Sequence, residues 1–432
     1  MKGLAIALGL AAASAQAATW DNEAGNYALS PLPDAATEAL RLDTDEREDQ
    51  QPLGRMVQAG EGLTITLPDL SDAVSASLII GFRPMWGVSQ GQQVEPLGPG
   101  QSRITATQAG PVYLLLTGAG PEVEFSLSGG KVIPLYVDGA MAAQDWQAEL
   151  AAHQGAAFLQ LVGDRAMITL TGQAYAAAPI PDPAASFAMI DQVLALQDDL
   201  SGLDGSAALD MPTPLRQHFV VDFRASAADR QNFYMYATDG FIGMLPDNTG
   251  DLTDPGKLAQ EWAIWHEVGH IHQQNSWTWG SVTEINVNVW SLFVQAALGN
   301  PNRLTAPEDG GKSTLARARD YLGQGDGPPD FMADDYDTVF IRLVMFHQLQ
   351  RVYGWDLFRG LNRASRSDPL PPDATDQAKV DYFVGKICIL TGEDLRGFFD
   401  RWGLRASDAA LAEIGRWGLP QPATDPARVF QR

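Results

Sequence analysis

The chain changes from a strand-like pattern to a helical pattern near residue 176. Before that point, short apolar runs rich in β-branched residues alternate with Gly, Pro, Asp and Ser, a pattern typical of antiparallel strands. These runs lie at residues 63–67, 77–82, 112–116, 123–127 and 166–170. Their spacing predicts an N-terminal β-sandwich over residues 18–175.

Beyond that point the apolar residues recur at helical spacing. The pattern predicts helices at residues 185–200, 257–275, 284–298, 338–352, 377–391 and 395–402. The prolines of AAAPIPDPAA hinder regular structure, so we assign a linker to residues 176–184. Residues 185–432 then form a mostly helical domain, and the fold class is α+β multidomain. Two Pro/Gly/Asp-rich stretches, residues 323–335 and 367–376, are expected to be long surface loops.

Residues 1–17 have the pattern of a secretory signal peptide. Lys2 supplies a positive start, residues 4–13 are apolar, and Ala15-Gln16-Ala17 has the small residues of a cleavage site. We therefore expect cleavage near Ala17 and a secreted or periplasmic protein. No apolar run reaches the length of a membrane span, so membrane insertion is not expected.

Composition and charge narrow the class of protein. With 432 residues, of which 45% are hydrophobic and 19% charged, the chain is long enough to bury a large core. The formal net charge of -24 argues against binding nucleic acid, which would repel the chain. Cys388 is the single cysteine, so no disulfide can form within the chain. The sequence does not indicate an oligomeric state.

The motif HEVGH lies within the predicted helix at residues 257–275. A spacing of four residues places His266 and His270 on one helix face, one turn apart, where two imidazoles can bind one metal ion. Catalytic zinc sites usually have three protein ligands and one water, so one ion and one further ligand are expected.

Two kinds of third ligand are possible. A third histidine would require the pattern HExxHxxGxxH, but Gln273 and Ser276 occupy the positions of its glycine and last histidine. Glu284 instead begins the next predicted helix, and an antiparallel return would direct its carboxylate at the metal. We therefore predict His266, His270 and Glu284 as the zinc ligands, with Glu267 as the general base beside the water.

Other residues are candidates for supporting roles. Asn288, one turn after Glu284, can orient a ligating histidine, although an asparagine that bonds only nearby backbone is an equal alternative. His272 is expected to point away from the ligand face. The candidates for contact with substrate are Asp239, Gly240, Tyr336, Trp277 and Arg303. For Asp239 the alternative is a turn residue, and for Trp277 it is core packing.

The residues IWHEVGHIHQQNSWTWGSVTEINVNVWSL, at 264–292, resemble the enhancin-like family of zinc peptidases. That family has a similar order of HExGH, His-Gln, a Trp-containing loop, Glu and Asn-x-Asn before an apolar helix. The weaker similarity extends over most of the helical half, through residues 235–243, 346–358 and 392–404.

The resemblance implies a zincin-like catalytic domain of the gluzincin type. It also implies a bacterial endopeptidase that cleaves glycoproteins, with mucin-type O-glycosylated chains as the characteristic substrate. Two alternatives remain open: a general zinc endopeptidase that is indifferent to glycans, and a glycan-binding adhesin with a vestigial zincin fold.

Overall fold

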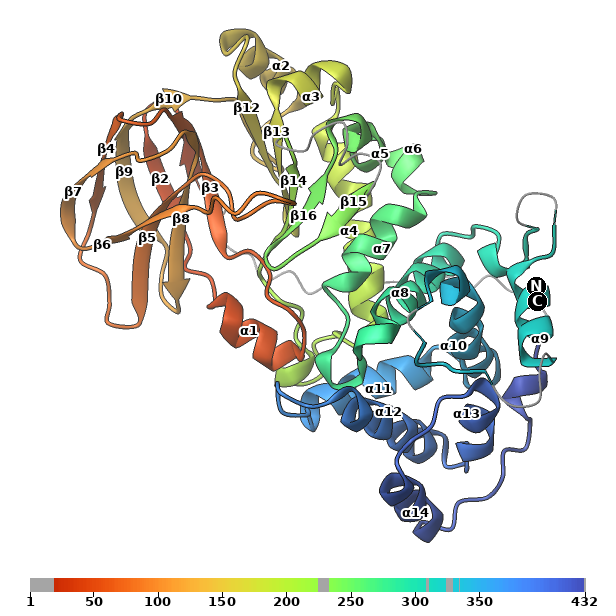
Figure 1. Cartoon of the computed structure of the whole chain (residues 1–432). Helices are drawn as coiled ribbons and strands as arrows, with labels where there is room; N and C mark the ends of the chain where they lie inside the picture. Colours follow the sequence, from red (N-terminus) through yellow and green to blue (C-terminus); the bar gives the residue numbers. More distant parts are fainter. Residues whose placement is uncertain (1–18, 224–232, 308–310, 324–328, 334, 431–432) are drawn as a thin grey trace. The chain divides into compact units, whose positions relative to one another are not determined.

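The computed structural model describes residues 19–223, 233–307, 311–323, 329–333 and 335–430 (Figure 1). The predicted signal peptide and part of the predicted loop at 323–335 lie outside the described residues. The chain divides into two compact units, one made of residues 1–32, 50–84 and 89–160 and the other of 33–49, 85–88 and 161–432. Sheets and helices both occur, so the fold is α+β as expected. Among the described residues, no helix is both long and apolar enough to span a membrane.

The first unit contains two five-stranded sheets in which paired strands run antiparallel. One sheet has the order β1 (Thr19–Asp21), β2 (Asn26–Leu29), β9 (Val123–Gly129), β4 (Gly62–Leu67) and β7 (Gly100–Thr105). The other has the order β10 (Lys131–Val132), β3 (Gln50–Val57), β8 (Gly110–Gly118), β5 (Val74–Ile80) and β6 (Gln93–Leu97). One apolar cluster includes side chains of both, such as Ile65 of β4 and Leu78 of β5.

Alternation of side chains explains these strands. In β4, Leu63, Ile65 and Leu67 are buried and the residues between them are not, as the period of two in a strand requires. After β10 the chain forms β11 (Leu135–Val137) and α2 (Ala143–Ala152), and it enters the second unit within β12 (Phe158–Val162).

The second unit contains a sheet that contributes residues to the candidate site described below. Its strands β13 (Ala166–Thr171), β14 (Gln217–Val221), β16 (Phe241–Met244) and β15 (Met235–Ala237) are neighbours in that order. The first three run parallel, and β15 runs antiparallel to β16 as the last strand of the sheet. All five residues of β14 are buried, which is usual for a central parallel strand covered on both faces.

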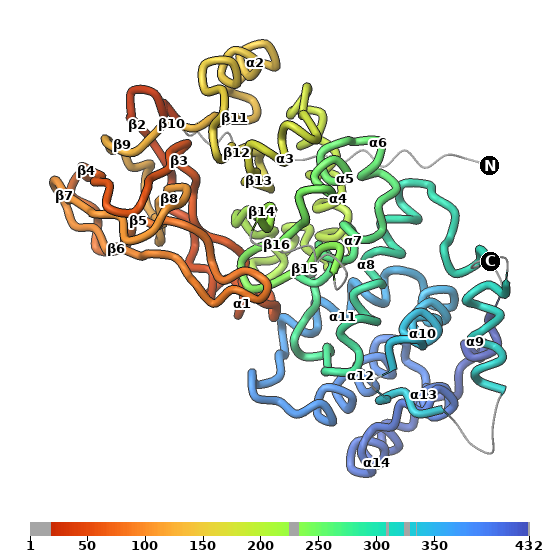
Figure 2. Tube along the Cα trace, turned by 45° about the horizontal axis from the view of Figure 1, so that its top comes forward, coloured from red at the N-terminus to blue at the C-terminus, as the bar shows by residue number. Residues whose placement is uncertain are grey.

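Helices make up most of the second unit, and one large apolar cluster joins many of them. Figure 2 shows α10, α11 and α12 gathered in one region, and these helices contact one another in sequence order. The helices are α1 (Ala35–Leu42), α3 (Gly172–Ala177), α4 (Pro183–Leu200), α5 (Thr249–Thr253), α6 (Pro255–Leu258), α7 (Trp262–His270), α8 (Thr283–Ala297), α9 (Thr314–Gly323), α10 (Val339–Tyr353), α11 (Asp356–Ser367), α12 (Asp376–Thr391), α13 (Arg396–Trp402) and α14 (Asp408–Arg416).

One predicted helix differs clearly from the structure. The continuous helix expected at residues 257–275 is two helices, α6 and α7, and α7 ends at His270. The side chain of Glu261 accepts a hydrogen bond from the backbone N–H of Ala263 and so starts α7 afresh. At the other end, the backbone N–H groups of His272 and Gln273 both donate to the carbonyl of Gly269. The chain therefore turns away immediately after the second histidine of the motif.

The segment after α7 is held by residues from much earlier in the chain. Asp43, at the end of α1, adopts a left-handed conformation with φ 58°. Its side chain accepts hydrogen bonds from the backbone N–H of Ser276 and from the hydroxyl of Ser365. Its carbonyl accepts a further bond from the N–H of Asn275 at 2.6 Å. These bonds stabilise the connection between α7 and α8.

Gly269 lets α7 and α8 approach each other closely. A Cβ atom at this position would lie 2.8 Å from Cγ2 of Val287 and 3.0 Å from the Val287 carbonyl oxygen. Both atoms belong to α8, so a side chain here would push the two helices apart. The glycine of HEVGH is thus a packing residue.

We expect Gly269→Ala to destabilise the chain. Overpacking of this kind costs about 1–3 kcal/mol, which exceeds the gain in helix propensity of about 1 kcal/mol. Thermal denaturation should show a fall in Tm of a few degrees. Gly397→Ala is the matched control, because Gly397 lies in α13 with no atom within 4 Å of an added Cβ. An equal Tm for both variants would contradict this account of Gly269.

Candidate metal centre

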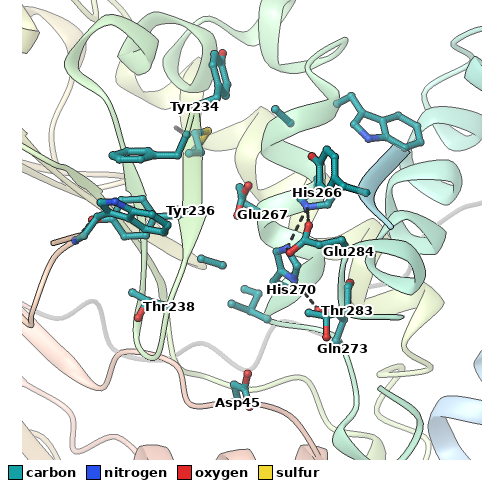
Figure 3. A pocket seen from close by; sticks show the side chains of 18 of the residues that line it. Asp45, Tyr234, Tyr236, Thr238, His266, Glu267, His270, Gln273, Thr283 and Glu284 are labelled. Atoms are coloured by element: carbon teal, nitrogen blue, oxygen red, sulfur yellow. Dashed lines mark hydrogen bonds and ion pairs between the residues drawn. The ribbon is translucent and has the colours of Figure 1, made fainter. Parts of the chain in front are cut away.

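Three ligand atoms from α7 and α8 converge at one point. His266 and His270 lie one turn apart on α7 and point to the same side, toward Glu284 in the first turn of α8 (Figure 3). Their Nε2 atoms are 3.0 Å apart. Oε2 of Glu284 lies 3.1 Å from Nε2 of His266, and Oε1 lies 3.7 Å from Nε2 of His270.

Asn288 fixes the orientation and tautomer of His266. Its Nδ2 donates to the backbone carbonyl of Glu284 at 2.9 Å, and its Oδ1 accepts from the indole N–H of Trp262 at 3.0 Å. The same Oδ1 lies 2.9 Å from Nδ1 of His266. Because an amide oxygen only accepts, Nδ1 carries a proton, so Nε2 has a free lone pair when the ring is neutral.

Gln273 has the same effect on His270. Its Nε2 donates to the backbone carbonyl of Thr283 at 2.7 Å and also to the side-chain oxygen of Asn286. Its Oε1 lies 2.6 Å from Nδ1 of His270 and therefore accepts that proton. Both amide side chains thus bond to the backbone at the start of α8 and to one imidazole of α7.

The donor set fits a zinc ion. Two imidazole nitrogens and a carboxylate, all within 4.8 Å of one another, match the ligands of catalytic zinc sites. Burial and the neighbouring His266 lower the pKa of His270 to about 4, so this ring is neutral at neutral pH. The hydrogen bond with His266 lowers the pKa of Glu284, so its carboxylate is charged. Neutral imidazoles and an ionised carboxylate are the forms that bind a metal.

Glu267 lies beside this group without belonging to it. Burial, together with the negative charge of Glu284, raises the pKa of Glu267 to about 7, although His266 and a backbone hydrogen bond at Ala237 oppose the rise. A carboxyl group with a pKa near neutrality is suited to accept and return a proton.

A second group of possible ligands occurs in the first unit. Glu23, Glu149 and His153 also lie within 4.8 Å of one another, and Nε2 of His153 is 2.6 Å from Oε1 of Glu23. The Glu23 side chain is 59% exposed, and none of the three residues lines the cavity over His266 and His270. A hydrogen bond between His153 and Glu23 accounts for their proximity.

A cavity of about 830 Å³ opens over the convergent residues. Three of the predicted substrate contacts, Asp239, Arg303 and Tyr336, line it together with Glu267. Tyr336 is 79% exposed. The guanidinium of Arg303 lies over the rings of Trp262 and Phe340, at 4.9 Å and 4.1 Å from their centres. This packing holds a positive charge at the cavity wall.

Two other predicted contacts do not reach the cavity. Trp277 is fully buried and stacks on Trp290 and Phe383, with ring centres 5.6 Å and 6.0 Å away. The prediction of Trp277 as a substrate contact is therefore corrected to core packing. Gly240 is buried, and its N–H donates to the carbonyl of Glu46. Its φ of 93° explains the glycine by backbone geometry alone.

Several residues of the site were not identified from the sequence. In the sequence, Gln273 stands out only as a departure from the three-histidine pattern, yet its side chain holds His270. Nothing in the motif indicates Trp262, whose indole N–H donates to Asn288. A polar residue three positions after a ligating histidine is a usable signal, because the turn that ends α7 keeps it within hydrogen-bond reach of that ring. Trp86, which also lines the cavity, is too distant in sequence to give any such signal.

His272 lies outside the ligand group, as its position in the motif predicts. Its Nε2 is 2.9 Å from Oδ1 of Asp198, and its Nδ1 is 2.8 Å from the carbonyl of Val268. Burial raises the pKa of Asp198, but the hydrogen bond to His272 and the charge of Arg165 outweigh it and lower the pKa to about 2. This buried network supports α7 from the side away from the cavity.

Comparison with known proteins supplies the family. The sequence model of peptidase M60, enhancin and enhancin-like, matches residues 129–403. The chain is 22% identical over 418 residues to TRPM8 channel-associated factor 3 of Rattus norvegicus, a match that covers 93% of this chain. The match covers 43% of that protein, so this chain spans less than half the length of that curated relative.

Solved structures share the fold. A conserved protein of unknown function from Bacillus anthracis, solved as a mutant, is 27% identical with a TM-score of 0.81, over 93% of this chain and 80% of that one. The M60 catalytic domain of Clostridium perfringens ZmpC, solved in complex with the sialyl T antigen, is 17% identical with a TM-score of 0.73. That match covers 93% of this chain and 81% of the other. The resemblance carried by residues 264–292 is confirmed, and the chain belongs to the peptidase M60 family of enhancin and enhancin-like proteins.

Proposed function

We propose that this chain is a zinc-dependent endopeptidase that cleaves glycoproteins. The observation that carries the proposal is the convergence of His266, His270 and Glu284 beside the partly buried Glu267. All four residues line one cavity large enough for a segment of polypeptide.

His266, His270 and Glu284 would hold one zinc ion. When bound, zinc supplies Lewis-acid chemistry that activates a water molecule and polarises the carbonyl of the scissile peptide bond. The chain itself supplies orientation, because Asn288 and Gln273 direct the Nε2 atoms inward. Glu267 takes the proton of the attacking water and later delivers it to the nitrogen of the leaving amine.

The end of the second unit's sheet offers a place for the substrate backbone. Within the described part of the chain, strand β15 pairs with β16 on one side only, and its residues Met235, Tyr236 and Ala237 line the cavity. Figure 3 shows Tyr236 and Thr238 on the wall that faces Glu267 and His270. An extended peptide that adds to this strand would pass in front of the catalytic carboxyl group.

A glycosylated substrate is supported by the family and by the similar fold of the ZmpC domain, which was solved with a glycan bound. Mucin-type O-glycosylated chains are the substrate class that the resemblance implies. Asp239, Tyr336 and Arg303 can meet hydroxyl groups at the cavity wall. The net charge of -24 favours neutral glycans over strongly anionic ones.

The remaining sequence-based expectations form part of the same proposal. We infer that the two antiparallel sheets form a β-sandwich ahead of a zincin-like catalytic domain, supported by the apolar cluster that both sheets share. Export after cleavage near Ala17 is supported by the pattern of residues 1–17.

Replacement of the proposed base should separate catalysis from metal binding. In Glu267→Gln, we expect kcat to fall by about 10²–10⁴-fold, because the general base is lost while the ligands are unchanged. Turnover of an O-glycoprotein, zinc content and Tm should be measured on the same sample. Unchanged cleavage with full zinc content would refute the role of Glu267. If the chain instead only binds glycans and has no peptidase activity, the parent chain would show no turnover.

Loss of an amide support should weaken metal binding. We expect Asn288→Leu and Gln273→Leu each to lower zinc affinity by about 10–100-fold, because each imidazole loses its orienting partner. Competition with a chelator measures the affinity. Asn300→Leu is the control, since Asn300 bonds the carbonyl of Ala259 and touches no ligand. Equal zinc affinity in all three variants would show that the amides do not orient the ligands.

The role of the glycan can be tested on the substrate alone. Enzymatic removal of O-glycans from a mucin-type substrate should abolish cleavage, because the sugar supplies binding at the cavity wall. Cleavage is followed by mass spectrometry of the products. Equal cleavage before and after deglycosylation would favour a general zinc endopeptidase.

A further inference from the structure

Trp86 is an exposed aromatic residue on the wall of the cavity. It lies far upstream of the motif, in the connection between β5 and β6, and residues 85–88 belong to the second unit. Trp86 lines the cavity with His266 and Glu267, and it is 47% exposed. Tryptophan is enriched at binding interfaces, because its ring offers a large apolar surface together with one polar N–H group.

The position of Trp86 is fixed by its own turn. The N–H of Val88 donates to the carbonyl of Met85 at 2.9 Å, which closes the turn around Trp86 and Gly87. Gly87 has a φ of 67°, which a turn of this kind requires at its third position. Met85 is buried and anchors the turn. The backbone that carries the exposed indole is therefore held by the turn.

Aromatic residues of the second unit support the indole from one side. The ring of Phe233 lies 5.2 Å and that of Tyr236 5.8 Å from the ring of Trp86, measured between centres. The hydroxyl of Tyr236 donates to Asp222 at 2.7 Å and accepts the backbone N–H of Trp86 at 3.2 Å. These contacts leave part of the indole open to the cavity.

Gly243 makes this arrangement possible. It is the cross-strand partner of Tyr236, and a Cβ atom there would lie 2.2 Å from the Tyr236 ring. The phenol therefore lies across the glycine, where it reaches both Asp222 and Trp86. Gly243 of β16 thus leaves room for the Tyr236 ring, which in turn contacts Trp86.

We propose that Trp86 is a stacking surface for a neutral hexopyranose ring on the substrate, and so determines specificity for glycosylated over bare peptide. The inference rests on the proposed function and names a residue for its glycan dependence. The C–H bonds on one face of a pyranose ring present positive edges to the negative face of an indole. The same cavity is lined by Asp239, Thr238 and Asp45, which can hydrogen-bond the hydroxyl groups of the sugar. An apolar side chain of a bare peptide offers no such hydrogen bonds.

The test compares two peptides of identical sequence, one with a single α-linked N-acetylgalactosamine on threonine. Binding is measured by calorimetry on the full chain with Glu267→Ala, so that turnover is strongly reduced. Adding Trp86→Ala should weaken binding of the glycopeptide about three- to tenfold and leave the bare peptide unchanged. Trp86→Phe should retain part of the affinity, since a smaller aromatic face remains.

Trp417→Ala is the matched control, because Trp417 is 36% exposed at the end of α14 and does not line the cavity. It should change neither affinity. Equal losses of affinity for both peptides would overturn the inference and would indicate that Trp86 contacts the peptide. The inference would also be overturned if neither peptide lost affinity, or if the glycopeptide did not bind at all. Glycopeptide binding that depends on Trp86, in a parent chain without turnover, would refute the peptidase proposal and leave the sugar site standing.

Discussion

The site depends on two carboxamide bridges between α7 and α8. Asn288 and Gln273 each donate to a carbonyl in the first turn of α8 and accept the Nδ1 proton of one imidazole of α7. The bonds to backbone fix which way each amide faces, and the amide in turn fixes the tautomer of the ring. Both Nε2 atoms are then directed at Glu284, so the geometry of the candidate metal centre is established by hydrogen bonds to the opposite side of each ring.

Close packing makes these bridges possible. Gly269 allows α8 to pass near enough to α7 for side chains of one helix to reach the carbonyls and rings of the other. The residues beyond His270 are held by Asp43, and the buried pair of His272 and Asp198 supports the far side of α7. Glu267 lies on the same helix, α7, where desolvation and the charge of Glu284 raise its pKa to about 7. One helix therefore carries both this carboxyl group and the two imidazoles.

The sequence predicted the parts of the site that repeat with helical period. His266 and His270 are separated by one turn, and Asn288 follows Glu284 by one turn, so each pair shares a face. The helical half was also anticipated, with α8, α10 and α12 near their predicted positions. The end of α7 was not predicted, because hydrogen bonds to Gly269 and Asp43 stop the helix while the apolar pattern continues. Trp277 illustrates another limit, since a tryptophan in a loop gives no sign of whether it faces the core or the cavity. Trp86 could not be placed at all, because a tertiary contact between distant segments brings it to the site.

The most direct measurement is anomalous diffraction at the zinc edge from crystals of the full chain grown with zinc. We expect a strong peak bounded by Nε2 of His266, Nε2 of His270 and the carboxylate of Glu284. Asn288 should bond Nδ1 of His266, and Gln273 should bond Nδ1 of His270. A peak only at Glu23, Glu149 and His153, or zinc bound through Nδ1 of either motif histidine, would contradict it.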